Sequence, residues 1–231
     1  MISLIIPSYN QADDLPMTLE SIFAQNYTDI EVVLVNDGST DHTDKAIEPY
    51  LGRIRYVKQE NKGCQAARNI GFEYSKGEYV MIMEADGVMV PHSLLTLLTA
   101  LERHPEASFA YSSFMWGWKK FRSQEYRMED LKKMNYIHTS ALIRREHFSG
   151  FDPEIKKFQD WDMWLTMAKQ GHTGVFVDEV LYAIGQHKGG ISSWMPSFMY
   201  KVPWQKFGIH IKTIERYHTA MKVIKQKHGL T

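Results

Sequence analysis

The sequence predicts an α/β fold, with a mostly parallel, Rossmann-like central sheet flanked by helices and a helical C-terminal tail. Strand-like and helix-like segments alternate through the first half of the chain, which is the pattern of βαβ units. The strand-like segment 29–36 contains a continuous Val/Leu run, as expected of a parallel strand covered on both faces. The 231 residues contain no internal repeat and no low-complexity linker, so we expect one core followed by a tail.

Four short β-rich segments are expected to form the strands of the first half. The third alternates apolar and polar residues, and the fourth is an apolar strand that ends with two carboxylates, Glu84 and Asp86. The four segments are residues 3–9, 29–36, 53–59 and 78–86.

A helical segment is expected after each of these strands. Pro16 and Pro91 lie near helix starts, where proline is tolerated, and Gly77 is expected to close the third helix. Ser, Thr and Asp residues supply candidate capping side chains. The four segments are residues 13–25, 37–51, 63–77 and 90–105.

After residue 110 the alternation becomes less regular. We expect two strands on either side of an irregular basic and aromatic segment, then a helix ending at Gly171 and a further strand. Beyond Trp194 the chain is aromatic and basic and then helical to its end. The segments, in chain order, are residues 107–114, 115–130, 135–145, 159–171 and 172–187.

Composition narrows the classes of protein that fit. No apolar run is long enough to span a bilayer, the N-terminal residues lack the basic region of a signal peptide, and the lone cysteine, Cys64, favours a reducing compartment, so a cytoplasmic location is expected. Residues 1–110 hold 8 Lys/Arg and 16 Asp/Glu, a net charge of −8, which argues against nucleic acid binding. Residues 194–231 hold 7 Lys/Arg and 1 Asp/Glu, so the tail either neutralises the acidic body or meets an anionic surface.

Polar residues gather where the predicted strands end. Asp37 follows the second strand, Glu84 and Asp86 follow the fourth, and the first ends in Pro-Ser-Tyr. Ligands of open α/β sheets bind outside the carboxyl ends of the strands, so these residues are expected to share one crevice. Two carboxylates one residue apart at a strand end suggest a metal site, and the alternative is that each Asp only nucleates a turn.

Four ordered segments resemble the signature segments of inverting family 2 glycosyltransferases with the A-type fold. They are residues 5–25, 33–43, 61–87 and 158–171. The resemblance implies an enzyme that binds a nucleotide-activated sugar with Mn²⁺ or Mg²⁺ and passes the sugar, expected to be a hexose, to a hydroxyl. It implies a glycosyltransferase domain over residues 1–190, with a nucleotide-sugar-binding half (1–110) and an acceptor-binding half (111–190), and a tail over 191–231.

The resemblance also implies the metal ligands. Asp86 matches the principal metal-ligating carboxylate, and Glu84 matches an aspartate that acts on the ribose or from the second coordination shell. Gly87 replaces a frequent third aspartate, which we interpret as lost electrostatic support. His187 matches a histidine that often completes the metal shell, and imidazole is an acceptable Mn²⁺ ligand.

The same comparison implies a nucleotide-sugar site. Asp37 matches the residue that accepts a hydrogen bond from the base, and Arg68 matches a cation near the phosphates, its alternative being an exposed helix arginine. The full set is Pro7, Ser8, Tyr9, Asp37, Arg68, Glu84, Ala85 and Asp86. The donor expected from the resemblance is a UDP-sugar, and the acceptor is a glycan or lipid-linked glycan.

Asp160 matches the family's general base. An inverting transfer needs one carboxylate to take the acceptor proton, and here Gln159 replaces the glutamate that usually precedes it, which would make Asp160 less basic. The alternative is that Asp160 or Asp162 caps the helix. Trp161 and Trp164 are candidates for an acceptor-stacking platform or for the core.

Three alternatives remain open at this stage. The aromatic and basic residues 194–212 suit either a peripheral membrane contact, at the inner face of the plasma membrane, or a flap over the acceptor cleft. The chain is either an active enzyme or a nucleotide-sugar-binding protein that has lost turnover, as Glu84, Gly87 and Gln159 would allow. A nucleotidyltransferase is the least favoured interpretation, because it would need a Gly-rich phosphate-binding loop near the N-terminus and this sequence has none there. The remaining histidines, His138 among them, are interpreted as structural.

Overall fold

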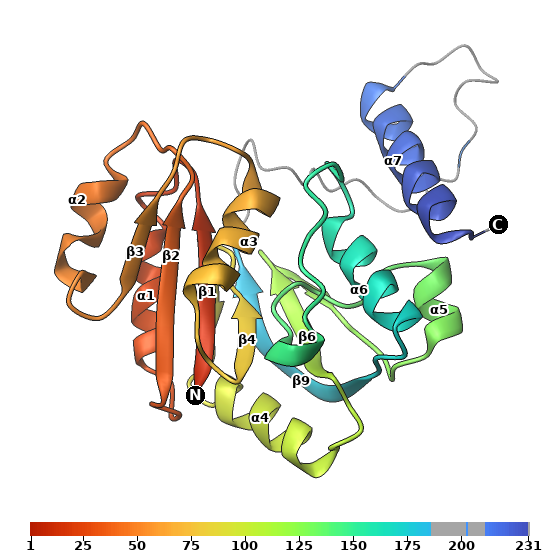
Figure 1. The fold of residues 1–231 in the computed structure, drawn as a ribbon, viewed down its shortest axis with the longest axis horizontal. Coiled ribbons are helices and arrows are strands. Elements are labelled where there is room, and N and C mark those ends of the chain that lie inside the picture. Colours follow the sequence, from red (N-terminus) through yellow and green to blue (C-terminus); the bar gives the residue numbers. More distant parts are fainter. Residues whose placement is uncertain (186–201, 203–210, 231) are drawn as a thin grey trace.

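The computed structural model describes residues 1–185, 202 and 211–230 (Figure 1). Its strands form one mixed sheet in the order β3-β2-β1-β4-β8-β6-β9-β5, with β7 paired to β6. The strands are β1 (Ile2–Ser8), β2 (Ile30–Asn36), β3 (Arg55–Lys58), β4 (Tyr79–Ile82), β5 (Gly87–Met89), β6 (Phe109–Trp116), β7 (Lys119–Phe121), β8 (Leu142–Arg144) and β9 (Gly174–Ile184). The predicted α/β class is confirmed.

Helices cover both faces of this sheet (Figure 1). They are α1 (Leu15–Phe23), α2 (Thr43–Ile47), α3 (Cys64–Tyr74), α4 (Ser93–Arg103), α5 (Met128–Lys133), α6 (Gln159–Lys169) and α7 (Lys212–His228), with 3₁₀ turns at Glu48–Tyr50 and Arg145–His147. The predicted helical end of the tail is confirmed by α7. Among the described residues, no helix is both long enough and apolar enough to cross a membrane.

Strand direction differs between the two halves of the sheet. The four strands β1 to β4 run parallel, because each is followed by a crossover segment that returns the chain to the same edge. The next strand along the sheet, β8, is antiparallel to β4, and β6 is antiparallel to β8. The parallel half of the sheet therefore comes from the part of the sequence in which strand and helix segments alternate regularly. The carboxyl ends of its four strands all lie on one side of the sheet.

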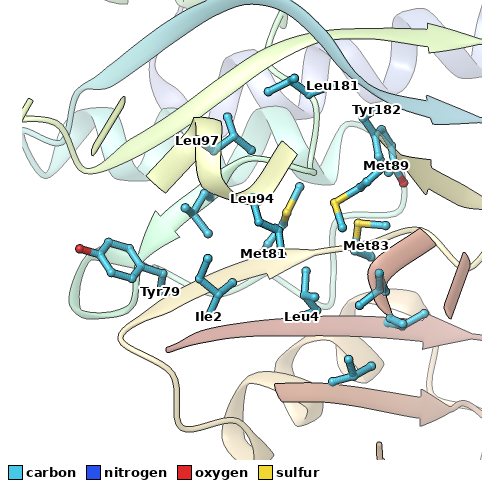
Figure 2. Packing of buried hydrophobic residues seen from close by; sticks show 14 of the residues in the cluster. Ile2, Leu4, Tyr79, Met81, Met83, Met89, Leu94, Leu97, Leu181 and Tyr182 are labelled. Atoms are coloured by element: carbon cyan, nitrogen blue, oxygen red, sulfur yellow. The ribbon is translucent and has the colours of Figure 1, made fainter. Parts of the chain in front are cut away.

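Alternation along β1 builds two separate cores. Ile2, Leu4 and Ile6 pack on the face covered by α1 and α4, while Ile5 packs on the opposite face with residues of α6. Figure 2 shows the first of these cores, where Ile2 and Leu4 lie next to side chains of β4 and α4. Burial of both faces explains the nearly uninterrupted apolar character of β1, β2 and β4.

Three predicted boundaries were wrong in detail. The third helix ends at Tyr74, and Gly77 lies beyond it, where a Cβ atom would approach the Ser3 backbone nitrogen to 2.7 Å. Gly77 is therefore a site of close strand approach and not a helix cap. The segment 135–145 contributes only the short strand β8, and the irregular segment 115–130 contains β7, which pairs with β6, and the start of α5.

A buried ion-pair cluster attaches α7 to α6. The carboxylate of Asp162, which is 3% exposed, accepts hydrogen bonds from Lys227 Nζ at 2.8 Å and His228 Nε2 at 2.7 Å. Lys227 also contacts Asp152 at 2.6 Å. Asp162 therefore holds the C-terminal helix in place, and the interpretation that it caps α6 was wrong, because its carboxylate is directed at α7.

We predict that Asp162→Asn loosens α7. The variant keeps the shape of the side chain but removes the buried charge, and hydrogen bonds to charged groups contribute about 1.5–3 kcal/mol each. We expect a loss of about 2 kcal/mol in the free energy of unfolding, measured by urea denaturation, and faster amide exchange in α7. Asp178→Asn is the matched control because its ion pair with Arg122 is largely exposed. Equal effects from the two substitutions would contradict the anchor role.

Candidate functional site

The carboxyl ends of β1, β2 and β4 lie on the side of the molecule where α6 begins (Figure 1). The first two ends are joined directly, since the backbone nitrogen of Asp37 donates a hydrogen bond of 2.9 Å to the Ser8 carbonyl. Topology therefore brings the predicted nucleotide residues to one edge of the sheet.

Asp37 organises the loop that leads into α3. One of its carboxylate oxygens accepts from Gln59 Nε2 at 2.6 Å and from the Lys62 backbone nitrogen at 2.8 Å, and the other accepts from the Gly63 nitrogen at 2.9 Å. A carboxylate offers about four acceptor positions, so one remains for a further donor. Asp37 thus does stabilise a loop, as the alternative to a binding role proposed. Its contact with the base of a nucleotide stays a prediction.

The segment after β1 presents its side chains unequally. Tyr9 is 47% exposed, whereas Pro7 and Ser8 are buried and the Ser8 hydroxyl has no hydrogen-bond partner in the described part of the chain. Tyr9 is therefore the side chain of the three that a ligand at this strand end can reach without rearrangement.

The acidic segment after β4 forms a tight turn that other elements hold in place. The Gly87 nitrogen donates to the Glu84 carbonyl at 2.9 Å, and Thr18 Oγ1 in α1 donates to the Ala85 carbonyl at 2.7 Å. Ala85 is buried and Asp86 is 8% exposed, while the Glu84 side chain is 26% exposed. The turn thus places two acidic residues at the strand end, with Asp86 buried and Glu84 partly exposed.

Tyr182 of β9 explains why residue 87 is glycine. A Cβ atom at Gly87 would lie 2.0 Å from the Tyr182 hydroxyl oxygen, which also accepts a hydrogen bond from the Glu84 backbone nitrogen at 3.1 Å. An aspartate at this position would displace the tyrosine. The glycine therefore makes room for a tyrosine that supports the turn. The sequence analysis had interpreted Gly87 only as lost electrostatic support.

Arg68 of α3 is buried beside this turn. Its Nη2 lies 2.8 Å from Glu84 Oε1, its side chain is 6% exposed, and its guanidinium lies 4.9 Å from the centre of the Phe151 ring. Burial opposes the positive charge, but Cys64, Glu84 and Asp160 together raise the pKa of Arg68 above its ordinary value. The alternative of an exposed helix arginine is wrong.

Asp160, the second residue of α6, lies within electrostatic reach of the same ion pair. Its Oδ2 accepts from Asn135 Nδ2 at 2.7 Å and its Oδ1 accepts from the Trp161 backbone nitrogen at 2.9 Å. Burial raises the pKa of Asp160, Glu84 adds to this rise, and Arg68 opposes it. Glu84 and Asp160, which are 76 positions apart in the sequence, therefore interact electrostatically with each other and with the same buried arginine.

The residue before α6 has a strained backbone. Phe158 adopts φ 61° and ψ 35°, a left-handed conformation that is unusual for a bulky side chain. Its ring packs edge-on against Trp161 and against Tyr217 of α7, and this packing holds the conformation. Gln159 donates to the Lys156 carbonyl at 2.9 Å and belongs to the same turn. Strain adjacent to Asp160 fits a functional position.

The segment that leads to Asp160 is fastened to α3. Asn69 makes two hydrogen bonds with the backbone of Phe151, of 2.7 and 2.9 Å, and Gln65 donates to the Ile155 carbonyl. Arg68 lies between these two residues in the sequence and on the buried side of the helix. One helix, α3, therefore positions both Arg68 and the loop that leads to the predicted base.

Two predicted acceptor residues do not face the site. Trp161 and Trp164 are 1% and 0% exposed, and their indole nitrogens donate to the Leu131 and Ile137 carbonyls. Their faces are covered by the core, so the acceptor-platform prediction was wrong and the core alternative holds. His187 lies outside the described residues.

Sequence reasoning missed the roles of Asn135, His138 and Tyr182, which lie outside the recognised motifs. Asn135 binds Asp160, Tyr182 binds the Glu84 backbone, and His138 packs against Tyr182. A lone His or Tyr has no spacing signal, so the sequence contained no sign of their role.

The carboxylates suit a divalent cation that arrives with a nucleotide. Among residues 1–185, 202 and 211–230, no group of three or more His, Cys, Asp or Glu side chains is arranged to hold a metal. Mg²⁺ in nucleotide sites is commonly held by one or two carboxylates together with substrate phosphates. Asp86 and Glu84 supply hard oxygen atoms of this kind, so the residues fit such an ion.

Solved structures share this architecture. Staphylococcus aureus TarS 1-349 in complex with UDP-GlcNAc aligns with a TM-score of 0.72 at 18% identity, covering 87% of this chain and 63% of that one. Mannosyltransferase PcManGT from Pyrobaculum calidifontis, in complex with GDP-Man and Mn²⁺, aligns with a TM-score of 0.64 at 22% identity, covering 82% and 58%. Identities this low show the fold alone.

Sequence comparison shows the family. An uncharacterized glycosyltransferase of Rickettsia felis is 30% identical over 191 residues, which are 73% of this chain and 31% of the relative, and chondroitin synthase of Pasteurella multocida is 27% identical over 191 residues, or 74% and 19%. The chain thus spans less than a third of the length of either relative. The family profile described as "Glycosyl transferase family 2" matches residues 3–153. The chain therefore belongs to glycosyl transferase family 2.

Proposed function

We propose that this glycosyltransferase is a metal-dependent, inverting enzyme that moves a sugar from a nucleotide-sugar donor to a hydroxyl of a glycan or lipid-linked glycan, with Asp160 as general base. One observation carries the proposal. The charges of Arg68 and Glu84, which pair at the end of β4, both act on the pKa of Asp160, and this supports placing the predicted base and the acidic turn at one site.

Asp160 is prepared for a proton transfer. Asn135 and the Trp161 backbone nitrogen each hold one of its oxygens, which fixes the direction of the carboxylate. Burial raises its pKa, so its ionised form is a stronger base than an exposed aspartate. In this mechanism it takes the proton of the acceptor hydroxyl while that oxygen attacks the anomeric carbon on the face opposite the leaving nucleotide.

The acidic turn after β4 is proposed to act on the diphosphate of the donor. A divalent cation bound there with the diphosphate supplies electrostatic stabilisation of the leaving group. Asp86 would hold it directly, with His187 as a second predicted ligand, and Glu84 would act from the second shell because Arg68 already occupies one of its oxygens. Arg68 keeps the neighbouring carboxylates from repelling one another.

The comparisons support a nucleotide-sugar donor. TarS is described with UDP-GlcNAc and PcManGT with GDP-Man and Mn²⁺. We propose a UDP-sugar, with Tyr9 and Asp37 near the base and ribose.

We further propose that residues 1–190 form the transferase domain, with the nucleotide half in 1–110 and the acceptor half in 111–190, and that 191–231 form a tail. The relative named chondroitin synthase is consistent with polysaccharide synthesis.

We predict that Asp160→Asn abolishes transfer while leaving donor binding intact. The amide is isosteric but does not accept a proton, and general base catalysis contributes about 10²- to 10⁴-fold. The measurement is kcat for transfer together with donor affinity, and Glu129→Gln, an exposed carboxylate on α5, is the control. Transfer that survives Asp160→Asn would refute the base assignment. Donor binding without transfer by the wild type would favour the alternative of a binding protein.

The pH dependence of transfer tests the same assignment. Because the pKa of Asp160 is raised, activity should fall on acidification at a pH above about 4, where an ordinary aspartate titrates. Glu84 contributes to the rise, so Glu84→Gln should move the acid limb of kcat/KM to lower pH. A limb that does not move, or moves upward, would show that another group controls it.

We predict that UDP stabilises the protein only when Mn²⁺ is present. A ligand at about 100 times its Kd contributes about 2.7 kcal/mol, which corresponds to roughly 5–10 °C in Tm for a chain of this size. Asp86→Asn should remove most of the Mn²⁺-dependent shift, and EDTA should do the same for the wild type. Thermal unfolding with UDP, GDP, dTDP and CMP identifies the base, and an equal shift without metal would contradict the cation role.

Membrane contact through residues 194–212 remains a prediction, and most of these residues lie outside the described ones. Truncation at Ser193 would also remove α7 and its contacts with Asp162, so substitution in the full chain is the better test. If the segment binds anionic lipid, replacing Trp194, Phe198 and Trp204 with alanine should lower co-sedimentation with phosphatidylglycerol vesicles. Unchanged co-sedimentation would remove the membrane role.

A further inference from the structure

His138 lies on a segment that connects the two ends of the candidate site. At one end of this segment Asn135 holds Asp160, and at the other end Ser140 contacts the His138 ring and Tyr182. The His138 ring packs between Phe114, at 4.5 Å between centroids, and Tyr182, at 5.4 Å. The residue is half-buried and is held by contacts on several sides.

The hydrogen bonds around His138 determine which ring nitrogen carries the proton. The Ser140 backbone nitrogen is a donor only, and it lies 3.2 Å from His138 Nδ1, so Nδ1 must accept. The Ser140 hydroxyl, 2.6 Å from the same Nδ1, must then donate to it as well. Neutral imidazole with an accepting Nδ1 carries its hydrogen on Nε2.

Two further contacts connect this segment to the acidic turn. Tyr182 interacts with Ser140, and its ring packs against the His138 ring. The Tyr182 oxygen also accepts a hydrogen bond from the Glu84 backbone nitrogen at 3.1 Å. His138 is therefore adjacent to the residue that supports the acidic turn.

The remaining ring nitrogen is an uncommitted donor. In the described part of the chain, Nε2 makes no hydrogen bond and is not one of the buried polar atoms that lack a partner, and the residue as a whole keeps part of its surface exposed. Burial and the nearby Arg68 lower the pKa of His138 to about 4 against the opposing charge of Glu84, so the ring is neutral at neutral pH. Arg68 and Glu84 are also the charged groups that act on Asp160.

We propose, on the premise that the chain transfers a sugar as described above, that His138 is a substrate-positioning residue whose neutral Nε2–H donates a hydrogen bond to an oxygen of the sugar being transferred. The anomeric carbon must lie between the leaving diphosphate, near the acidic turn, and Asp160. The segment carrying His138 joins these two places. A neutral donor suits a hydroxyl or amide oxygen, whereas phosphate oxygens are better matched by cations.

Two amide substitutions separate the ring nitrogens. His138→Asn places an acceptor oxygen where Nδ1 receives Ser140 but has nothing at the Nε2 position, while His138→Gln reaches the Nε2 position with an N–H₂ group. Affinities for UDP and UDP-GlcNAc, and for GDP and GDP-Man, are measured by calorimetry. For the nucleotide sugar that binds the wild type, we expect His138→Asn to weaken binding by roughly 3- to 10-fold, with the free nucleotide unaffected and His138→Gln close to wild type.

The outcomes separate this inference from the proposed function. If the wild type binds nucleotide sugars and His138→Asn binds them equally well relative to the nucleotide, the inference is wrong and the proposed function stands. If the wild type binds none of these donors and transfers no sugar, the proposed function itself fails. A loss of the same size for free nucleotide and nucleotide sugar would mean a structural role and would also overturn the inference.

The tautomer is testable without any substrate. The ¹⁵N chemical shifts of the imidazole should show a protonated Nε2 and an unprotonated Nδ1 at pH 7 in the wild-type chain, and the same form should persist to pH 5.5. A protonated Nδ1 would remove the donor from the site and overturn the proposal, even if the amide variants unfold.

Discussion

The arrangement of the site depends on the buried contact between Arg68 and Glu84. A guanidinium in this position must be paired, because an isolated charge removed from water is strongly unfavourable. The guanidinium of Arg68 pairs with Glu84 in the turn after β4 and lies over the ring of Phe151. Its positive charge also acts on the pKa of Asp160. One side chain from α3 therefore links the parallel half of the sheet to the half that begins after residue 110.

The two halves contribute different things to the site. The parallel half presents strand ends and backbone groups at one edge of the sheet. Some of its carboxylates bind loops, as Asp37 does in the loop before α3. The second half supplies the side chains that act across the gap, namely Asp160 and the segment from Asn135 to Ser140. Gln65 and Asn69 of α3 bind the backbone of the loop before Asp160, so direct hydrogen bonds connect the two halves.

Tyr182 shows how one residue can change the meaning of another. The glycine at position 87 departs from the acidic pattern of the family resemblance, yet its lack of a side chain makes room for a tyrosine that supports the Glu84 turn. The same tyrosine packs against the ring of His138. The departure from the family pattern at position 87 is thus explained by packing against a residue nearly a hundred positions away.

The sequence by itself determined the fold class, the parallel strands and the strand-end positions of Asp37, Glu84 and Asp86, because apolar periodicity and strand–helix alternation are local signals. It also pointed to Asp160, through the resemblance of residues 158–171 to a family segment. Only the tertiary structure decided that Arg68 is buried, that Trp161 and Trp164 belong to the core, that Asp162 anchors α7, and that His138 and Tyr182 adjoin the site. These properties arise where segments distant in the sequence pack together, and no periodicity within a single segment records which partner it will meet.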